Sequence, residues 1–302
     1  MRRCSGPRPW AEQEGSTVQL EQQERSLLAA LTDEHRLWPA GAEPVVLARG
    51  SENTTFAVGD CIVRLGADRD AVAREVALLR ALGSRTAVAV PAPLVHRPEL
   101  GLLVYRRVPG TPLISRQDRS SPSLVRGLVE VLGALRSVGA GLELPTDDYA
   151  AQEWHRDAVE AFGRVRSHLG AGEASLVAAF LDREPPPPRV GRVPQHNDLG
   201  AEHLLVDARG HLTGVIDWSD AARTDPARDL GSLYRDLGGA TAHRVAEALG
   251  QPLTEDEAGR VRFHARCRWL EDVAYGLQDP AGRGVYLENA RRTFAHTFGE
   301  RG

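Results

Sequence analysis

The chain contains no lysine, and all 37 of its basic residues are arginine. Chemistry that needs a fixed cation must therefore use arginine, whose guanidinium stays charged and binds carboxylates or phosphates through two N–H groups. Cysteine is scarce as well: Cys4, Cys61 and Cys267 are far apart and form no CxxC pair. We expect free thiols in a reducing cytoplasm rather than disulfides or a cysteine-bound metal.

Long apolar runs are also missing. No stretch approaches the ~20 residues that a membrane-spanning helix needs, and no apolar segment follows the basic start "MRRCSGPRPW", as a secretion signal would require. The net charge of −4 argues against a nucleic-acid partner. We expect a cytoplasmic protein, a monomer or weak dimer, with no membrane and no nucleic-acid partner.

Hydrophobic periodicity predicts a sheet-rich first part. After a patternless stretch over residues 1–18, which predicts a mobile tail, a helix is expected over 19–37. β-type runs follow in "VVLA", "TTFAV" and "CIVRL", and the dipeptide Gly59-Asp60 between the last two is typical of a hairpin turn. A helix over 71–82 and two strands, in "VAVPAP" and "GLLVYRRVPG", complete a lobe over residues 19–110.

Helices dominate residues 111–302. They are expected at about 122–138, 151–169 and 172–182, and again from Pro226 onward, whereas the connector "EPPPPRVGRVP" cannot be helical. The sequence therefore predicts an α+β, bilobal fold: a small antiparallel-sheet lobe, a larger helical lobe, and a cleft between them.

The stretch "HNDLGAEHLLVD" brings two histidines and an acid close to a predicted hairpin centred near Gly210. His203 and Asp217 lie seven residues to either side of that centre, so we expect them to face each other at its open end, with Asp198 just upstream. A zinc site on His196 and His203 would need a third ligand from Asp217 or Asp198. A hard divalent cation on His203 and Asp217 fits phosphate chemistry better. A hairpin with polar ends and no chemistry is the alternative.

A second pair of charged residues lies in the first lobe. Glu75 falls on the apolar stripe of the helix over 71–82, where a carboxylate needs a cationic partner. Arg64 alternates with Val63 and Leu65 on the preceding strand and can reach Glu75. A strand cation paired with a helix glutamate orients nucleotide phosphates in kinases, and a structural salt bridge is the alternative.

Two weaker signals accompany these pairs. The turn "RGSEN" offers Gly50 and Ser51 for phosphate contacts, although a plain hairpin turn explains it equally well. In "TDPARDLGSLYRDLG", Asp225 is expected to cap a helix, and Asp229 on its first turn favours the helix dipole and can brace the loop before it.

Taken together, "HNDLGAEHLLVD…GHLTGVIDWSDAARTDPARDLG" resembles the aminoglycoside phosphotransferase family, which shares the protein-kinase-like fold. The usual family pattern is H-G-D-x-x-x-x-N, followed by a strand ending in I-D-[FW]. Asn197 and His203 replace its glycine and asparagine, as in the subgroup that phosphorylates the 2″-hydroxyl of aminoglycosides. "LEDVAYGLQD" is also similar to that subgroup, and "VIDWSDAARTDPARD" is similar to the macrolide phosphotransferases.

The resemblance implies a role for each candidate. Asp198 would be the catalytic base or hydroxyl orienter, and His203 and Asp217 would bind Mg²⁺. Arg64 with Glu75 would lie at the phosphates of ATP or GTP. Backbone groups of the hinge would hold the base of the nucleotide, at Arg106, Arg107 and Val108. Because a neutral imidazole brings less charge than a carboxylate, we expect weak magnesium binding that is lost below the ordinary histidine pKa of ~6.5.

The acceptor is open between three classes. A polycationic aminoglycoside, the preferred choice, would need acidic residues beside the base, and candidates are Asp217, Asp220, Asp225, Asp229, Asp236, Glu271, Asp272 and Asp279. A macrolide would need an apolar pocket, to which Trp218, Trp269, Tyr275 and Leu277 could contribute. A small amino alcohol or sugar is the third class. A non-catalytic nucleotide-binding protein is disfavoured, because Arg64, Glu75, Asp198 and Asp217 are all present.

Overall fold

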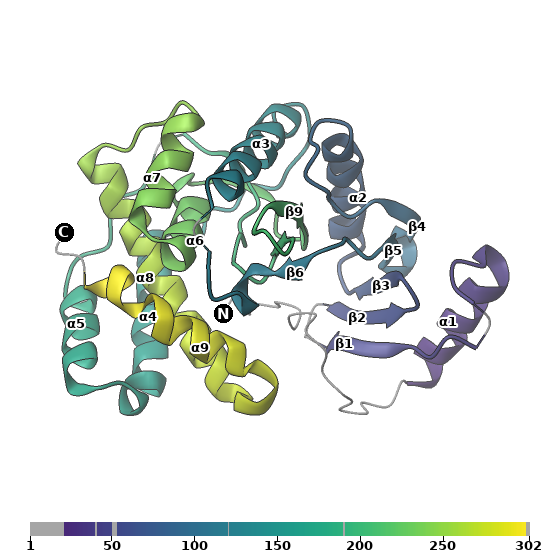
Figure 1. Ribbon diagram of the computed structural model, residues 1–302, viewed down its shortest axis with the longest axis horizontal. Coiled ribbons are helices and arrows are strands. Elements are labelled where there is room, and N and C mark those ends of the chain that lie inside the picture. The colour runs from purple at the N-terminus through teal and green to yellow at the C-terminus, as the bar shows by residue number, and fades with distance from the viewer. Residues whose placement is uncertain (1–20, 40, 50–52, 120, 190, 300–302) are drawn as a thin grey trace.

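The computed structural model describes residues 21–39, 41–49, 53–119, 121–189 and 191–299. Within them the chain forms the two lobes that the sequence predicts, an antiparallel sheet with two helices and a larger helical lobe (Figure 1). The fold class is therefore α+β and bilobal, as predicted. The segment 1–18, predicted as a mobile tail, lies outside the described residues.

The N-terminal lobe is a five-stranded antiparallel sheet in the order β1-β2-β3-β5-β4, with a helix on each face. Side chains alternate along β3, so that Cys61 and Val63 pack toward α1 while Ile62 packs toward α2. Arg64 therefore lies on the α2 side. The elements are α1 Gln22–His35, β1 Val45–Arg49, β2 Asn53–Val58, β3 Cys61–Gly66, α2 Arg69–Gly83, β4 Pro93–Arg97, a 3₁₀ turn η1 Pro98–Leu100, and β5 Leu102–Arg106.

The predicted hairpin between β2 and β3 is confirmed, with Gly59 at φ 58° in the turn. The predicted strand in "VAVPAP" is wrong, because β4 begins only at Pro93. Prolines in this segment lack the N–H that a sheet ladder needs. Ala89 instead pairs with Gly214 of the other lobe, and its N–H donates to the Thr213 carbonyl at 3.0 Å.

The C-terminal lobe begins where β6 pairs with β8. Its strands form a three-stranded sheet, β6-β8-β9, and a two-stranded one, β10-β7. The elements are β6 Thr111–Pro112, η2 Leu113–Ser115, α3 Pro122–Gly139, α4 Ala151–Val165, η3 Arg166–His168, α5 Ala171–Leu181, β7 Val193–Gln195, β8 Leu204–Val206, β9 Leu212–Val215, β10 Ala222–Thr224, α6 Ala227–Leu237, α7 Gly239–Ala248, α8 Glu255–Gln278 and α9 Pro280–Phe298.

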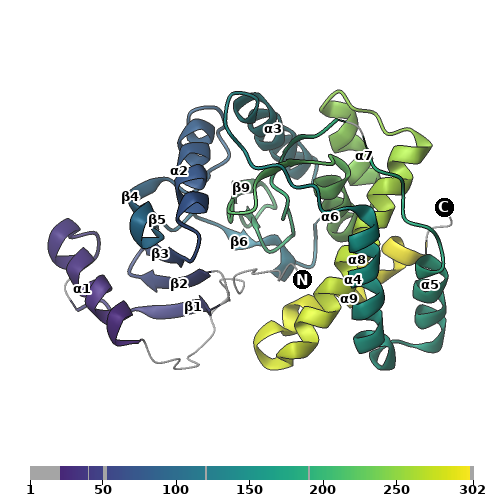
Figure 2. The same cartoon turned by 180° about the vertical axis from the view of Figure 1, so that it is seen from behind.

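Helix α6 is the centre of this lobe, and its first ten residues are all buried. The long helix α8 packs against it and also contacts α4 and α9 (Figure 2). The two helices approach closely at Gly231, where an added Cβ would lie 2.7 Å from the Cβ of His264 and 3.1 Å from the backbone nitrogen of Ala265. The crossing of α6 and α8 therefore depends on a glycine.

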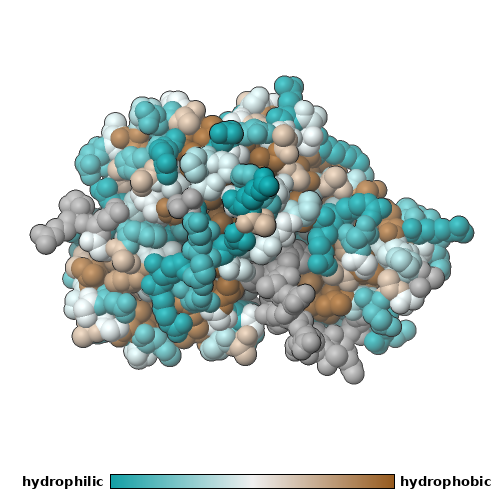
Figure 3. Space-filling model, viewed as in Figure 1, coloured by the Kyte–Doolittle hydropathy of each residue, from teal (hydrophilic) through white to brown (hydrophobic). Residues whose placement is uncertain are grey.

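The molecular surface shows apolar residues in small patches between polar ones on the face seen in Figure 3. None of the helices in the described ranges is both long and apolar enough to span a bilayer. Cys61 and Cys267 are buried free thiols, as predicted, and burial raises the pKa of Cys61 to about 11. Such thiols are poor nucleophiles at neutral pH.

Candidate active site

The segment "HNDLGAEH" is a loop between β7 and β8, and helix α6 holds it at both ends. The backbone N–H groups of His196 and Asn197 donate to the two carboxylate oxygens of Asp229, each at 2.8 Å. Farther along, the N–H of Ala201 donates to Asp236 at 2.8 Å. These two aspartates are two turns apart on one side of α6. The prediction that Asp229 braces the loop is confirmed.

Asn197 takes the left-handed backbone conformation, with φ 69°, in which asparagine is among the better-tolerated residues. Its amide nitrogen donates to Asp147 at 2.8 Å and to the carbonyl of Asp220 at 3.1 Å. Its amide oxygen accepts from Arg228 at 3.1 Å, and Arg228 pairs with Asp147 at 2.7 Å. Asparagine thus supplies the backbone conformation and three anchoring contacts, whereas the glycine of the family pattern would supply only the conformation.

Asp198, the predicted base, is largely buried at the end of this anchored segment. Its Oδ1 accepts from Nη1 of Arg268 at 2.9 Å, and its Oδ2 lies 3.7 Å from Nδ1 of His203. Burial raises the pKa of Asp198, but the charges of His203 and Arg268 outweigh it and hold the pKa below its ordinary value. The carboxylate is therefore ionised and able to accept a hydrogen bond.

Arg268 was not among the predicted residues, although its signal was present. On α8 it lies seven residues after Val261 and three after Ala265, and all three side chains are buried. An arginine on an apolar stripe is the same signal that identified Glu75. Asp272, one turn farther on, is buried as well.

The β8–β9 hairpin has a register one residue away from the predicted one, because Val206 pairs with Leu212 and the turn is therefore centred on Arg209 rather than on Gly210. A bulge on β9 then shifts the pairing by one residue toward the predicted register. Leu204 pairs with Val215, so His203 is opposite Ile216, whose N–H donates to the His203 carbonyl at 3.0 Å. Asp217 follows in a left-handed conformation, φ 62°, and its Oδ2 still lies 3.7 Å from Nε2 of His203. The predicted proximity is confirmed, and the predicted pairing is wrong.

His203 and Asp217 fit a hard divalent cation. Nδ1 of His203 lies 2.7 Å from the carbonyl oxygen of Asp198, which can only accept, so this nitrogen carries a proton. Nε2 is then the atom that faces Asp217, and it is buried with no hydrogen-bond partner among the described residues. The remaining ligands would be water and phosphate oxygens, as is usual for Mg²⁺. Among the described residues, no group of three or more His, Cys, Asp or Glu side chains is arranged to hold a metal ion.

The charge around His203 supports the same conclusion. Burial lowers the pKa of His203, but the carboxylates of Asp198, Glu202 and Asp217 outweigh it and raise the pKa to about 9. Without a metal, the ring holds a second proton at neutral pH, which a bound cation would replace. The ordinary value of ~6.5, used in the sequence-based expectation, does not apply to this ring.

In the N-terminal lobe the predicted pair of Arg64 and Glu75 is confirmed. Nη2 of Arg64 forms an ion pair with Oε2 of Glu75, and both side chains are buried. Nη1 of Arg64 lies 3.5 Å from Oδ1 of Asp217. The arginine therefore contacts a carboxylate of each lobe, which a purely local salt bridge between strand and helix would not do.

The other predicted nucleotide-binding residues are less informative. Gly50 and Ser51 lie outside the described residues. At the hinge, Arg106 pairs with Asp60, and the backbone N–H of Arg107 donates to the Asp60 carbonyl at 2.8 Å. That N–H therefore already has an acceptor within the lobe, and the binding of a nucleotide base by backbone groups at Arg106, Arg107 and Val108 stays a prediction. Val108 is buried in a small apolar cluster with residues of the β8–β9 hairpin.

Four of the eight acids predicted to face a cationic acceptor already have partners within the C-terminal lobe. Asp229 and Asp236 bind the loop, as described above, and Asp225 pairs with Arg260 and accepts from the N–H of Ala227 at 2.9 Å. Asp279 caps α9. The predicted acidic wall is therefore wrong for Asp225, Asp229 and Asp236, because arginine side chains and backbone N–H groups of the lobe bind their carboxylates.

Two of the predicted acids, Asp236 and Asp272, form a cluster with Glu202 beside the loop. Arg235 is buried within 4 Å of three carboxylates: Glu202 at 3.7 Å, Asp236 at 2.8 Å and Asp272 at 3.0 Å. Burial raises the pKa of Glu202 and of Asp272, although Arg235 opposes the rise. Glu202 Oε2 and the Tyr286 hydroxyl have no hydrogen-bond partner among the described residues. Three carboxylates therefore surround Arg235, while the charges of Arg119 and His203 also act on Asp236 and Glu202. Asp236 and Asp272 are among the predicted acids, and Glu202 is not.

The apolar pocket predicted for a macrolide is not formed by the residues named for it. Trp218 and Trp269 are core residues, 1% and 2% exposed. The ring of Tyr275 is covered by the guanidinium of Arg283 at 3.9 Å, and Leu277 packs against the helical core. These side chains are used for packing, so that part of the prediction is wrong.

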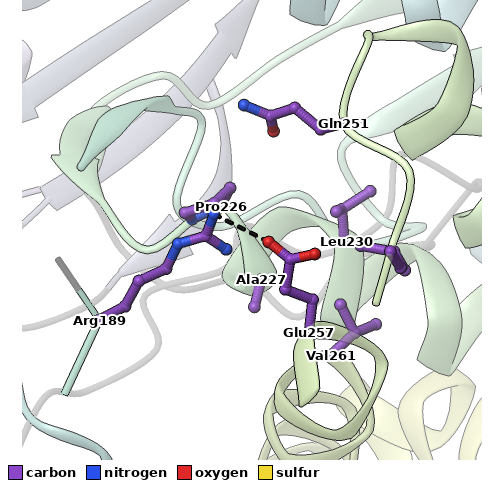
Figure 4. A pocket seen from close by; sticks show the side chains of 8 residues that line it. Arg189, Pro226, Ala227, Leu230, Gln251, Glu257 and Val261 are labelled. Carbon is purple, nitrogen blue, oxygen red and sulfur yellow. Dashed lines mark ion pairs between the residues drawn. The ribbon is translucent and has the colours of Figure 1, made fainter. Parts of the chain in front are cut away.

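A small pocket also lies away from the loop, between the proline-rich connector, α6 and α8 (Figure 4). Its volume is about 10 Å³, enough for roughly one water molecule. Arg189 and Glu257 pair across it at 3.1 Å. It is too small for a substrate and is not a second candidate site.

Comparisons with known proteins agree with this arrangement. The family model described as "Phosphotransferase enzyme family" matches residues 43–264. Viomycin phosphotransferase from Streptomyces vinaceus is 27% identical over 237 residues, which are 72% of this chain and 81% of the relative.

Solved structures share the fold at low identity. The GDP and kanamycin complex of APH(2")-IIia superposes with a TM-score of 0.61 at 20% identity, over 89% of this chain and 98% of the other. Macrolide 2'-phosphotransferase type I does so with a TM-score of 0.57 at 19% identity, over 91% and 98%. At such identities the likeness shows the architecture alone.

Proposed function

Because the chain belongs to the phosphotransferase enzyme family, we propose that it moves the γ-phosphoryl group of ATP or GTP to a hydroxyl of a small antibiotic-like molecule. The family match covers more than two thirds of the chain and includes the loop and both hairpins described above. Nucleotide-dependent phosphotransfer follows from this membership. The choice of donor, the acceptor and the roles of individual residues are our proposal.

The observation that carries the proposal is a continuous line of charged groups from one lobe to the other. Glu75 pairs with Arg64, Arg64 lies 3.5 Å from Asp217, Asp217 lies 3.7 Å from His203, and His203 lies 3.7 Å from Asp198. Phosphoryl transfer needs a cation at the nucleotide phosphates, a metal site and a hydroxyl-binding carboxylate in this order. A structural salt bridge in the N-terminal lobe would not require the remaining members.

Each residue has a defined task in this scheme. Asp198 would accept a hydrogen bond from the acceptor hydroxyl and take its proton late, since a loose transition state demands little basicity. Arg64, held by Glu75, would orient the α- and β-phosphates. A magnesium ion held by Asp217 and His203 would neutralise charge on the β- and γ-phosphate oxygens.

The acidic cluster around Arg235 favours a polycationic acceptor. It places Glu202 in the same loop as Asp198, and three carboxylates surround Arg235. An ammonium or guanidinium group of the acceptor would stabilise the charged forms of Glu202 and Asp272, whose pKa values burial raises. Relatives are named for viomycin, kanamycin and macrolides. An aminoglycoside remains our first choice, because Trp218 and Trp269 are core residues and supply no apolar wall for a macrolide.

The test is a phosphorylation screen with ATP and with GTP against aminoglycosides, viomycin, macrolides and small amino alcohols. We expect transfer to at least one polycationic acceptor by the wild type and none by Asp198→Ala. Preferential phosphorylation of a macrolide would overturn the acceptor class. Nucleotide binding without transfer to any compound in the panel would overturn the proposed activity.

A further inference from the structure

We propose that Arg268 is a positioning residue that fixes the carboxylate of Asp198 relative to the backbone of its own loop. The inference rests on the proposed function and adds to it a residue of α8 that the phosphate-binding scheme does not include.

The geometry of the contact is specific. Nη1 of Arg268 donates to Oδ1 of Asp198 at 2.9 Å, and Nη2 donates to the carbonyl oxygen of Asn197. One planar group thus binds the side chain of one residue and the main chain of the residue before it. Because the guanidinium is rigid, the two bonds together restrict rotation of the Asp198 side chain about its Cα–Cβ bond.

Arg268 is in turn held by an aromatic ring. Its guanidinium lies 5.2 Å from the ring centroid of Trp154 in α4, within the range of a cation–π contact. The guanidinium of Arg228 lies 5.6 Å from the same ring and binds the side chain of Asn197. Arg228 and Arg268 therefore both contact the indole of Trp154, and they bind consecutive residues of the loop, Asn197 and Asp198.

The requirement for such a device follows from the reaction. A carboxylate that accepts a substrate hydroxyl must keep one orientation, because a displacement of about 1 Å can cost about 100-fold in rate. The loop is anchored at its backbone by α6, but those bonds do not restrain the Asp198 side chain. Among the described residues, Arg268 supplies the hydrogen bond from another side chain to that carboxylate.

The experiment compares Arg268→Ala and Arg268→Lys with Arg266→Ala. Arg266 is on the same helix, where its guanidinium lies over Phe180 and Phe298 and its Nε donates to the Thr297 carbonyl at 2.9 Å. It is a matched control for loss of a partly buried arginine from α8. Steady-state kinetics with the best acceptor of the screen give kcat and both KM values, and thermal unfolding reports the fold.

We expect kcat to fall about 100-fold in Arg268→Ala and about 10-fold in Arg268→Lys, because lysine keeps the charge and loses the two-pronged geometry. Both KM values should stay within about twofold of wild type, since the residue orients a group rather than binding substrate. Guanidinium ion in the assay should restore part of the kcat of Arg268→Ala and should not affect Arg266→Ala.

Two results would overturn the inference. The first is an Arg268→Ala kcat within about threefold of the Arg266→Ala value. The second is a loss confined to the KM of the nucleotide, which would mean direct phosphate binding. If Arg268→Ala does not fold, Arg268→Lys and Trp154→Leu carry the test, and unchanged kcat in both is equally decisive. A wild type without transfer refutes the proposed function; an active wild type that tolerates these changes refutes this inference alone.

Discussion

The two lobes hold their charged residues in different ways. In the N-terminal lobe, Arg64 and Glu75 are separated by eleven residues and sit on a strand and the helix that follows it. In the C-terminal lobe, residues 196–201 are also bound by side chains of α6, of α8 and of the segment before α4, which lie between 31 and 71 residues away. A site built from neighbours in sequence can be recognised from local periodicity, whereas one built from distant helices depends on their packing.

The largest expected effect concerns Asp198, in the loop that helices distant in sequence hold in place. Asp198→Asn keeps the shape of the side chain and removes its ability to take a proton, so kcat should fall by roughly 10³–10⁴-fold. Steady-state transfer assays measure the change. Binding of the nucleotide, followed by calorimetry, should persist, because Asp198 contacts no residue of the N-terminal lobe among the contacts described above. A kcat within tenfold of wild type would remove Asp198 from the role of base.

The next effect breaks the locally held pair. Glu75→Gln removes the charge that balances the buried Arg64, and we expect kcat/KM for the nucleotide to fall about 10- to 100-fold through a raised KM. Glu24→Gln is the matched control, because Glu24 is also buried in this lobe and pairs with Arg49 at 2.8 Å. Equal kinetic effects in the two variants would show that the pair of Arg64 and Glu75 is only structural.

Asp229 binds backbone N–H groups that are distant in sequence, and it can be compared with Asp207, which binds N–H groups close to it in sequence. Asp229→Ala leaves the N–H groups of His196 and Asn197 buried without an acceptor, and we expect the free energy of unfolding to fall by about 2–3 kcal/mol. The loss is moderated because burial raises the pKa of Asp229 to about 6, so its charge is itself costly. Chemical denaturation of the wild type and of Asp229→Ala measures the net change in the free energy of unfolding.

The control for that variant is Asp207→Ala. Asp207 also accepts two backbone N–H groups, those of Arg209 and His211, but in an exposed turn. Water can replace it there, so its loss should lower the free energy of unfolding much less than the loss of Asp229 does. Similar costs for the two substitutions would contradict the claim that distance and burial distinguish the loop anchors.

The smallest expected effect concerns the dependence of stability on pH. It compares a buried histidine of the C-terminal lobe with an exposed one. Burial lowers the pKa of His264 to about 3, against the opposing charge of Asp225. The folded pKa lies below the unfolded value of about 6.5, so stability present at higher pH is lost as the pH falls below 6.5. Between pH 6.5 and 5.5 this histidine should cost about 1 kcal/mol.

His264→Phe should flatten that part of the curve, because phenylalanine keeps a ring between Trp154 and Phe263 and cannot take a proton. Urea unfolding at a series of pH values measures the slope. His243→Gln, at an exposed position on α7, should leave the wild-type slope in place. A His264→Phe curve parallel to wild type would place the acid sensitivity elsewhere.

The same difference between the lobes explains what could be predicted from sequence. Glu75 was found because a charge on an apolar stripe needs a nearby partner, and Arg64 lay one strand away. The β8–β9 hairpin was predicted, yet its register was one residue off, because its turn is centred on Arg209 rather than on Gly210, and the residue pattern marks neither that centre nor the bulge beside it. Asp229 was predicted as a brace from its place on the first turn of α6, although it lies 33 residues after His196.

Arg268 and Glu202 were missed for a related reason. Their roles depend on where α8 crosses the loop, and neither periodicity nor spacing fixes that crossing. Trp218 and Trp269 were misjudged because composition cannot tell a tryptophan that lines a pocket from one that fills a core. The fold class, in contrast, followed from alternating and helical periodicities that are local and strong.

The close approach of α6 and α8 at Gly231 also affects how the loop that carries Asp198 is held. Alanine at this position would press a methyl group against His264 and the α8 backbone, so the helices would have to separate by a few tenths of an ångström. Since α6 carries the backbone anchors of the loop and α8 carries the arginine that grips Asp198, that separation would pull the two supports apart. The hydrogen atom of Gly231, in place of a methyl group, thus sets the spacing of the two helices that hold Asp198, the proposed base.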